Sequence, residues 1–204
     1  MNKENIATAM SRVSAVMTEK REYLVKLDQF CGDGDLGVSM ASGFAAVKAC
    51  LDEAEETDLG KLFRKMANAF NEAAPSSLGT IISIGMMGMA VSLKGKDTMT
   101  LGELAGAMNT GVERIMQRAK SKPGEKTVLD GLVPAVEALL RADRTGAEWK
   151  DALSAAAKAA ADGAESTRNM IPQHGRAAYY GDKNLGHLDG GAEVARLMFQ
   201  ALAE

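Results

Sequence analysis

Apolar residues recur along the chain at the three- and four-residue spacing of an amphipathic helix. In the first segment this spacing predicts one helix over residues 4–26. Its apolar face consists of Ile6, Met10, Val13, Met17 and Leu24. Similar patterns predict seven further helices, over residues 37–51, 58–73, 78–94, 100–120, 128–141, 147–166 and 189–203. No segment alternates between apolar and polar residues between hairpin turns, so we expect an all-α fold.

Length and composition agree with one packed domain. The chain has 204 residues, of which 46% are hydrophobic and 25% are charged, values that exclude disorder and fibrous repeats. Aromatic residues make up only 4%, whereas there are 13 methionines, a balance that favours helices over sheets. We therefore expect a single domain over residues 1–204.

Charge and cysteine usage exclude several classes of function. The formal net charge is -3 and no Lys/Arg-rich block occurs, so neither nucleic acid nor an anionic membrane surface is an expected partner. The N-terminal segment carries charge every few residues, unlike a signal peptide, and no run of 18 apolar residues exists. Two cysteines indicate no disulfide framework. A cytoplasmic location is expected.

Glycine is overrepresented for a helical protein, with 21 residues. Many of them fall in two connections between predicted helices. The first contains Gly32, Gly34 and Gly37, and the last contains Gly175, Gly181, Gly186, Gly190 and Gly191. The segment from residue 171 to residue 189 holds both histidines and two of the three tyrosines. Long connections without regular structure are usually functional or disordered, and this composition favours function.

The first of these connections places Asp28, Asp33 and Asp35 within eight residues. Carboxylates so close repel one another unless a cation neutralises them, and oxygen-only ligands suit Mg²⁺, Mn²⁺ or Ca²⁺. The alternative is a solvated acidic turn in which Asp35 interacts favourably with the dipole of the next helix. Residue types alone leave both interpretations open.

Three common motifs do not account for these segments. Residues 32–37 match GxGxxG, but no strand precedes them and their aspartates would repel a pyrophosphate. An EF-hand beginning at Asp33 would need a carboxylate at the position of Phe44. Residues 124–127 end like a Walker A loop, but Ala119 stands where that motif needs glycine. A phosphate site in which metal ions lie between aspartates and phosphate oxygens remains.

Four motifs in series resemble those of the nucleotide-binding L subunits of dihydroxyacetone kinases. They are Asp28 with GDGDLGVSM, SSLGT at residues 76–80, GEKTVLDGLVPA at residues 124–135, and HGRAAYYGDKNLGHLDGGA at residues 174–192. The resemblance covers essentially the whole chain. It implies a barrel of eight antiparallel helices with a nucleotide at one rim, which agrees with the number of helices predicted from periodicity.

The resemblance also implies roles for individual residues. Asp28, Asp33 and Asp35 would hold two Mg²⁺ ions that bridge the phosphates of ADP or ATP. Other residues would contact the nucleotide: Leu36, Gly37, Val38 and Ser39 at a helix start, Ser76 and Ser77 at another, Gly124 and Thr127 near the base or ribose, and Arg176, Asp189, Gly190 and Gly191 from the last connection.

Each of these roles has a structural alternative. Ser76 and Ser77 would also serve as helix caps after Pro75, and Thr127 would cap the helix that begins at Val128. The alternative for Arg176 is an ion pair with Asp182 or Asp189 within its own connection. For His187 we expect a hydrogen-bonding role beside the site, and for the Met-rich residues 86–89 a role in the core.

The chain departs from the family pattern at positions near the nucleotide. Leu36 and Ser39 stand where the family commonly has histidine and asparagine, Ala73-Ala74-Pro75 replaces a Gly-Ser-Gly flank, and Gly190 replaces a proline. Because the three aspartates are present, we expect Mg-nucleotide binding with altered contacts to the base or the α-phosphate. The sugar substrate need not be dihydroxyacetone.

The resemblance implies one half of a kinase. A separate K subunit would hold a small hydroxyketone, and this chain would present phosphate to its hydroxyl group. Phosphate would come from fresh ATP, or from a phosphohistidine subunit of a sugar phosphotransferase system that rephosphorylates a retained ADP. The alternatives are a nucleotide-loaded regulatory module without catalysis, and a metal-dependent phosphatase that acts alone; a homodimer is a further arrangement to consider.

Overall fold

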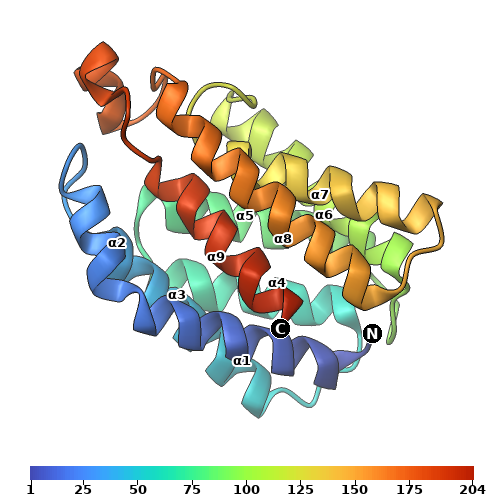
Figure 1. The fold of residues 1–204 in the computed structure, drawn as a ribbon. Helices are drawn as coiled ribbons and strands as arrows, with labels where there is room; N and C mark the ends of the chain where they lie inside the picture. Colours follow the sequence, from blue (N-terminus) through green and yellow to red (C-terminus); the bar gives the residue numbers. More distant parts are fainter.

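The computed structural model describes all residues from 1 to 204, and it is all-α, as predicted. The chain forms nine α-helices, with two short 3-10 segments between the last two of them; Figure 1 shows their arrangement. The α-helices are α1 (Lys3–Glu19), α2 (Arg21–Asp28), α3 (Leu36–Glu53), α4 (Leu59–Ala73), α5 (Ser77–Ser92), α6 (Leu101–Ala119), α7 (Leu129–Arg144), α8 (Trp149–Ser166) and α9 (Gly190–Ala203). The one β-type pairing is an isolated bridge between Asn2 and Thr98.

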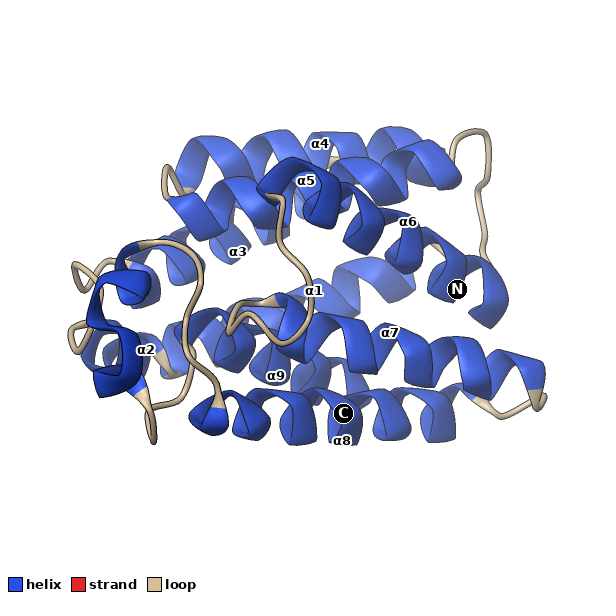
Figure 2. Ribbon diagram, turned by 90° about the horizontal axis from the view of Figure 1, so that it is seen from above, coloured by secondary structure: helices blue, strands red, loops and turns tan.

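The helices form a closed barrel. From α3 to α9 each helix packs against its successor, and α9 packs against α1, which itself packs against α3. Figures 1 and 2 show α1 and α2 following one another along one side of the barrel. Together they occupy one of the eight helix positions in the barrel wall. The barrel of eight antiparallel helices is therefore confirmed.

The prediction of one continuous helix over residues 4–26 is wrong. The helix breaks at Lys20, whose dihedral angles (φ -87°, ψ 5°) end α1, and α2 begins at Arg21. Neither proline nor glycine lies at the break, so the sequence does not mark it. The cause is tertiary: the start of α2 lies against Gly37 of α3, where any side chain would collide with the Arg21 carbonyl. The break thus lets α2 pack closely on α3.

Most helix starts carry the expected capping residues. Asn2 with Asn5, and Thr100 with Glu103, form reciprocal capping boxes at α1 and α6. The side chain of Asp58 accepts a hydrogen bond from the Lys61 amide at the start of α4. These local signals explain why the predicted boundaries of most other helices differ from the observed ones by only a few residues.

The barrel interior is apolar. Phe44 and Phe70 meet edge to face with ring centroids 4.9 Å apart, and Met86 is buried while Met87 and Met89 pack against the same core. The Met-rich stretch is therefore part of the core, as predicted. Apolar side chains also enclose a cavity of about 140 Å³ inside the barrel. None of the helices combines the length and the hydropathy that crossing a membrane requires.

The connection between α8 and α9 contains two 3-10 segments, and the second of them lies within residues 171–189, which were expected to lack regular structure. They are η1 (Thr167–Asn169) and η2 (Arg176–Asn184), and η2 is kinked at Gly181 (φ 51°, ψ -131°). Figure 2 shows this connection arching over one end of the barrel, beside the connection between α2 and α3. Two connections that are far apart in the sequence therefore meet at one rim.

Candidate functional site

A pocket of about 380 Å³ opens at this rim, where five segments of the chain meet. Its walls come from the α2–α3 connection, the start of α5, the end of α6, the turn before α7 and the last connection. Eleven of the residues singled out from the sequence line it: Asp28, Asp33, Asp35, Leu36, Ser76, Ser77, Thr127, Arg176, Asp189, Gly190 and Gly191. Folding thus brings most of the predicted nucleotide and metal residues to one place.

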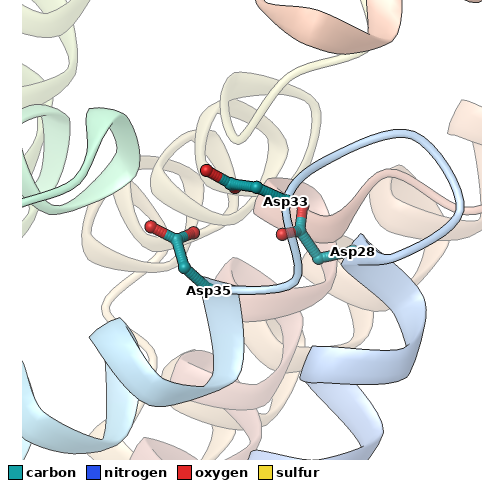
Figure 3. A group of neighbouring side chains, drawn as sticks. All are labelled: Asp28, Asp33 and Asp35. Carbon is teal, nitrogen blue, oxygen red and sulfur yellow. The ribbon is translucent and has the colours of Figure 1, made fainter.

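The three aspartates form one cluster within the pocket. Asp28 is the last residue of α2, Asp35 immediately precedes α3, and Asp33 lies on the connection between them. Figure 3 shows their side chains extending toward a common space on one side of the loop. One carboxylate oxygen from each lies within 4.8 Å of the others. Three oxygens at this separation, with no nitrogen or sulfur ligand in the set, suit a hard divalent cation such as Mg²⁺.

Backbone contacts hold this loop in shape. The Asp28 carboxylate accepts a hydrogen bond from the Gly34 amide (2.7 Å), and the Asp28 carbonyl accepts one from the Gly32 amide (2.6 Å). Gly34 has φ 78°, a conformation that side chains rarely adopt. A side chain at Gly32 would overlap the Asp28 carboxylate. The glycines therefore permit the loop to fold tightly around Asp28.

The electrostatics of the cluster reflect its crowding. Burial, followed by the charges of Asp33 and Asp28, raises the pKa of Asp35. The pKa of Asp33 is lowered, chiefly by its hydrogen bond with Arg176. Although Asp35 occupies the N-cap position of α3, its side chain makes no capping hydrogen bond. The Asp35 carboxylate is therefore not engaged as a helix cap, and it is available together with Asp28 and Asp33 as a cation ligand.

Arg176 joins the last connection to the acidic loop. Its guanidinium forms an ion pair with Asp33, in place of the pairs with Asp182 or Asp189 that were considered from the sequence. Both side chains are at least half exposed, so this contact is solvent-screened. A planar cation is thereby placed at the mouth of the pocket, where it is available to an anionic group.

Three residues that line the pocket also accept hydrogen bonds from backbone amides at helix starts: Ser76, Thr127 and Asp189. The Ser76 hydroxyl accepts from the Gly79 amide at 3.1 Å, and the Thr127 hydroxyl accepts from the Leu129 amide at 3.2 Å. The Asp189 carboxylate accepts from the Ala192 amide at 2.8 Å. The capping role considered for Ser76 is therefore present, and Asp189 caps α9. Thr127 lies one position before Val128, the N-cap of α7. All three residues also line the pocket.

Asp189 has the most perturbed acid group of the site. Burial, opposed by hydrogen bonds from backbone amides and reinforced by the charge of Asp130, raises its pKa to about 6. Lys126 opposes the rise. The side chain is partly covered rather than fully enclosed.

Four of the expected nucleotide residues do not line this pocket. Gly37 faces α2, Val38 is exposed, and Ser39 is buried in the first turns of α3. Gly124 lies in an exposed turn, where its amide donates to the Asp130 carboxylate at 2.5 Å. Their positions beside the site are set by helix packing and turn formation.

The structure adds residues that the sequence did not single out. Lys126, Cys31 and His174 also line the pocket. The Nε2 atom of His174 lies 2.6 Å from the Glu125 carboxylate. His187, expected to hydrogen-bond beside the site, instead stacks its ring on Phe30 with centroids 3.5 Å apart. The only sequence signal for Lys126 is its place in a segment that ends like a Walker A loop.

Comparisons with known proteins identify the family to which this chain is similar. Residues 30–204 match the DAK2 domain. The chain is 30% identical over 203 residues to the PEP-dependent dihydroxyacetone kinase ADP-binding subunit DhaL of Escherichia coli K12, covering 100% of this chain and 97% of that protein. A Listeria innocua ADP-binding subunit DhaL is 31% identical over 94% of this chain and 89% of its own length. The human triokinase/FMN cyclase is 30% identical over 98% of this chain and 35% of its own length.

Solved structures show the same fold. The native dihydroxyacetone kinase of C. freundii superimposes with a TM-score of 0.77 and 26% identity over 97% of this chain. The same kinase in complex with AMP-PNP and Mg²⁺ superimposes equally well, also with a TM-score of 0.77. The chain spans about a third of the length of those crystallised chains, 34% and 33% respectively.

Proposed function

The chain belongs to the DAK2 domain family, and from that premise we propose that it is the Mg-nucleotide-binding subunit of a dihydroxyacetone-kinase-like phosphotransferase. The observation that carries the proposal is the cluster of Asp28, Asp33 and Asp35 at the wall of a 380 Å³ pocket. Helix starts line the same pocket, and Arg176 lies at its mouth. The names of the relatives that this chain covers almost completely describe ADP-binding subunits, which supports a nucleotide in this pocket.

In this proposal the three aspartates would hold two Mg²⁺ ions beside the phosphates of ADP or ATP. When bound, the ions would supply charge neutralisation. The amides at the start of α3 and of α5 favour the phosphates through the positive end of each helix dipole. Arg176 donates from the last connection, and Thr127 lies toward the base or ribose. Catalysis by this chain is then positioning and charge stabilisation.

The acceptor hydroxyl group is proposed to arrive with a second protein. A K-type subunit would hold a small hydroxyketone over the rim, which matches the open mouth of the pocket beside Arg176. The names of the bacterial relatives describe PEP-dependent kinases, which supports a phosphotransferase-system protein as the phosphate donor. Exchange of ATP is the second route, supported by the C. freundii dihydroxyacetone kinase structure in complex with AMP-PNP and Mg²⁺.

Nucleotide binding is tested by thermal unfolding of nucleotide-free protein with ADP, with and without Mg²⁺. We expect the melting temperature to rise with ADP only when Mg²⁺ is present, because a ligand that binds only the folded state stabilises it. Asp33→Asn should weaken Mg·ADP binding about tenfold or more, since one of three anionic ligands is lost. Asp97→Asn, at an exposed position, is the matched control. A wild-type protein without a Mg-dependent shift would overturn the proposal.

Transfer is tested with the partner present. Mixing the chain with a K-type subunit, dihydroxyacetone and either ATP or a phosphorylated phosphotransferase-system protein should give phosphorylated ketose, and Asp33→Asn should abolish it. Tight Mg·ADP binding with no transfer from either donor would favour the regulatory-module alternative.

A further inference from the structure

Lys126 is a buried lysine that the proposed nucleotide contacts leave unexplained. It lies in the turn before α7, its exposure is 3%, and its backbone adopts a left-handed conformation (φ 59°) that is uncommon for residues other than glycine. Lysine is among the residues least often buried without a partner. A function for its ammonium group inside the protein is therefore expected.

The ammonium group is fully engaged by backbone carbonyls. Lys126 Nζ donates to the carbonyl oxygens of Met170 (3.2 Å), Asn184 (2.9 Å) and His187 (2.8 Å). An ammonium group has three N–H donors, so these three acceptors use all of them. All three carbonyls belong to the connection between α8 and α9, whereas Lys126 belongs to the turn before α7. The lysine thus joins two segments that are 44 to 61 residues apart in the sequence.

The turn that carries Lys126 is itself held firmly. The Asp130 carboxylate accepts from the Gly124 amide (2.5 Å) and from the Thr127 amide (2.7 Å). The neighbouring Glu125 makes two further contacts with the last connection: its carbonyl accepts from the Gln173 amide at 3.2 Å, and its carboxylate contacts His174. The turn before α7 is therefore held in place by several hydrogen bonds, and it supports the last connection.

A direct phosphate contact by Lys126 is the main alternative, because Lys126 lines the pocket and its segment ends like a Walker A loop. In a Walker A loop the lysine reaches the phosphates. Here the three donors are directed at protein carbonyls, and the backbone carbonyls would lose a buried partner if the lysine turned away. The contacts therefore favour a role within the protein.

We propose that Lys126 is a positioning residue that fastens the last connection to the turn before α7, and so holds Arg176 and the Asp189–Gly191 turn around the nucleotide. The fastening of residues 170–187 does not require a nucleotide. Its expected effect, slower release of the nucleotide, rests on the proposed function. The ammonium group of Lys126 and the Asp189 carboxylate also attract each other, so each favours the charged form of the other.

The test compares Lys126→Met with Lys126→Arg by amide hydrogen exchange of the nucleotide-free protein. Both variants should exchange about tenfold or more faster than wild type within residues 170–187, while α4 remains unchanged. Arginine keeps the positive charge, but its planar guanidinium cannot direct three N–H groups to the same three carbonyls. Lys122→Met, at an exposed position in the same segment, is the matched control and should exchange like wild type.

Two outcomes would overturn the inference. Unchanged exchange of residues 170–187 in Lys126→Met would show that the lysine does not fasten the connection. Wild-type exchange in Lys126→Arg would show that the charge alone suffices.

With Mg·ADP present, we expect both variants to release ADP about tenfold faster, which stopped-flow displacement measures. If wild type binds no Mg·ADP, the proposed function fails while the exchange experiment still decides the role of Lys126.

Discussion

At the scale of single residues, the site is built from side chains that serve two purposes. Asp28 accepts hydrogen bonds that shape its loop and also contributes a carboxylate to the cluster. Ser76 and Asp189 cap helices and also line the pocket. This dual use follows from where they sit, since helix starts on the rim need capping and also face the pocket.

Asp189 should give the protein a pH-dependent stability. Its pKa is about 6 in the folded protein, above the ordinary value of 3.8. A carboxyl group that holds its proton more tightly when folded makes the free energy of unfolding fall as the pH rises from about 4 to about 6. Above pH 6 this contribution is constant.

Asp189→Asn should remove that dependence and keep the helix cap. We expect the variant and wild type to be similarly stable near pH 4, and the variant to be more stable by about 1–3 kcal/mol above pH 6. Urea unfolding across this pH range measures the difference, with Asp97→Asn as the exposed control. A variant that is less stable than wild type at pH 7 would contradict the assigned cause.

At the scale of elements, glycine has a second use that composition did not reveal. Many of the 21 glycines lie inside helices at close helix–helix contacts, whereas the sequence drew attention to the two connections. In α5, a Cβ atom at Gly88 would lie 2.6 Å from Gly111 Cα in α6. In α6, Gly106 has no neighbour within 4 Å of such an atom. These two glycines therefore differ sharply in what an added methyl group would meet.

The pair Gly88→Ala and Gly106→Ala tests this interpretation. Gly88→Ala should lower the free energy of unfolding by about 1–3 kcal/mol, because α5 and α6 must move apart. Gly106→Ala should raise it by about 0.5–1 kcal/mol, because alanine favours the helix and meets no obstacle. Denaturant unfolding with constant m-values measures both. Equal effects of the two substitutions would show that close helix packing does not determine the cost.

At the scale of the whole molecule, the barrel brings distant segments to one rim. The pocket draws on residues from Leu27 to Gly191, and the closure of the ring by α9 against α1 sets their relative positions. Arg176 and Lys126 each link segments of this rim across long sequence separations. Such contacts form only when the barrel has closed.

The isolated chain should bind nucleotide without hydrolysing it. In the proposed function the acceptor hydroxyl belongs to a molecule held by a partner, so Mg·ATP alone should release phosphate no faster than a protein-free solution. A continuous phosphate-release assay measures this, with Asp33→Asn as the control for contaminating activity. Phosphate release that requires Asp33 and no second protein would favour the phosphatase alternative.

The sequence by itself determined the helices and the clustering of the three aspartates. Helical periodicity and capping residues act over a few positions, so seven of the eight predicted helices appear where expected. The three aspartates lie close in sequence, and their clustering follows from one short loop.

Only the tertiary structure decided the break at Lys20, the pairing of Arg176 with Asp33, and the burial of Lys126. Each of these depends on groups that are brought together from separate segments of the chain. Periodicity and spacing describe one segment at a time, whereas these features depend on which surface of another segment lies opposite.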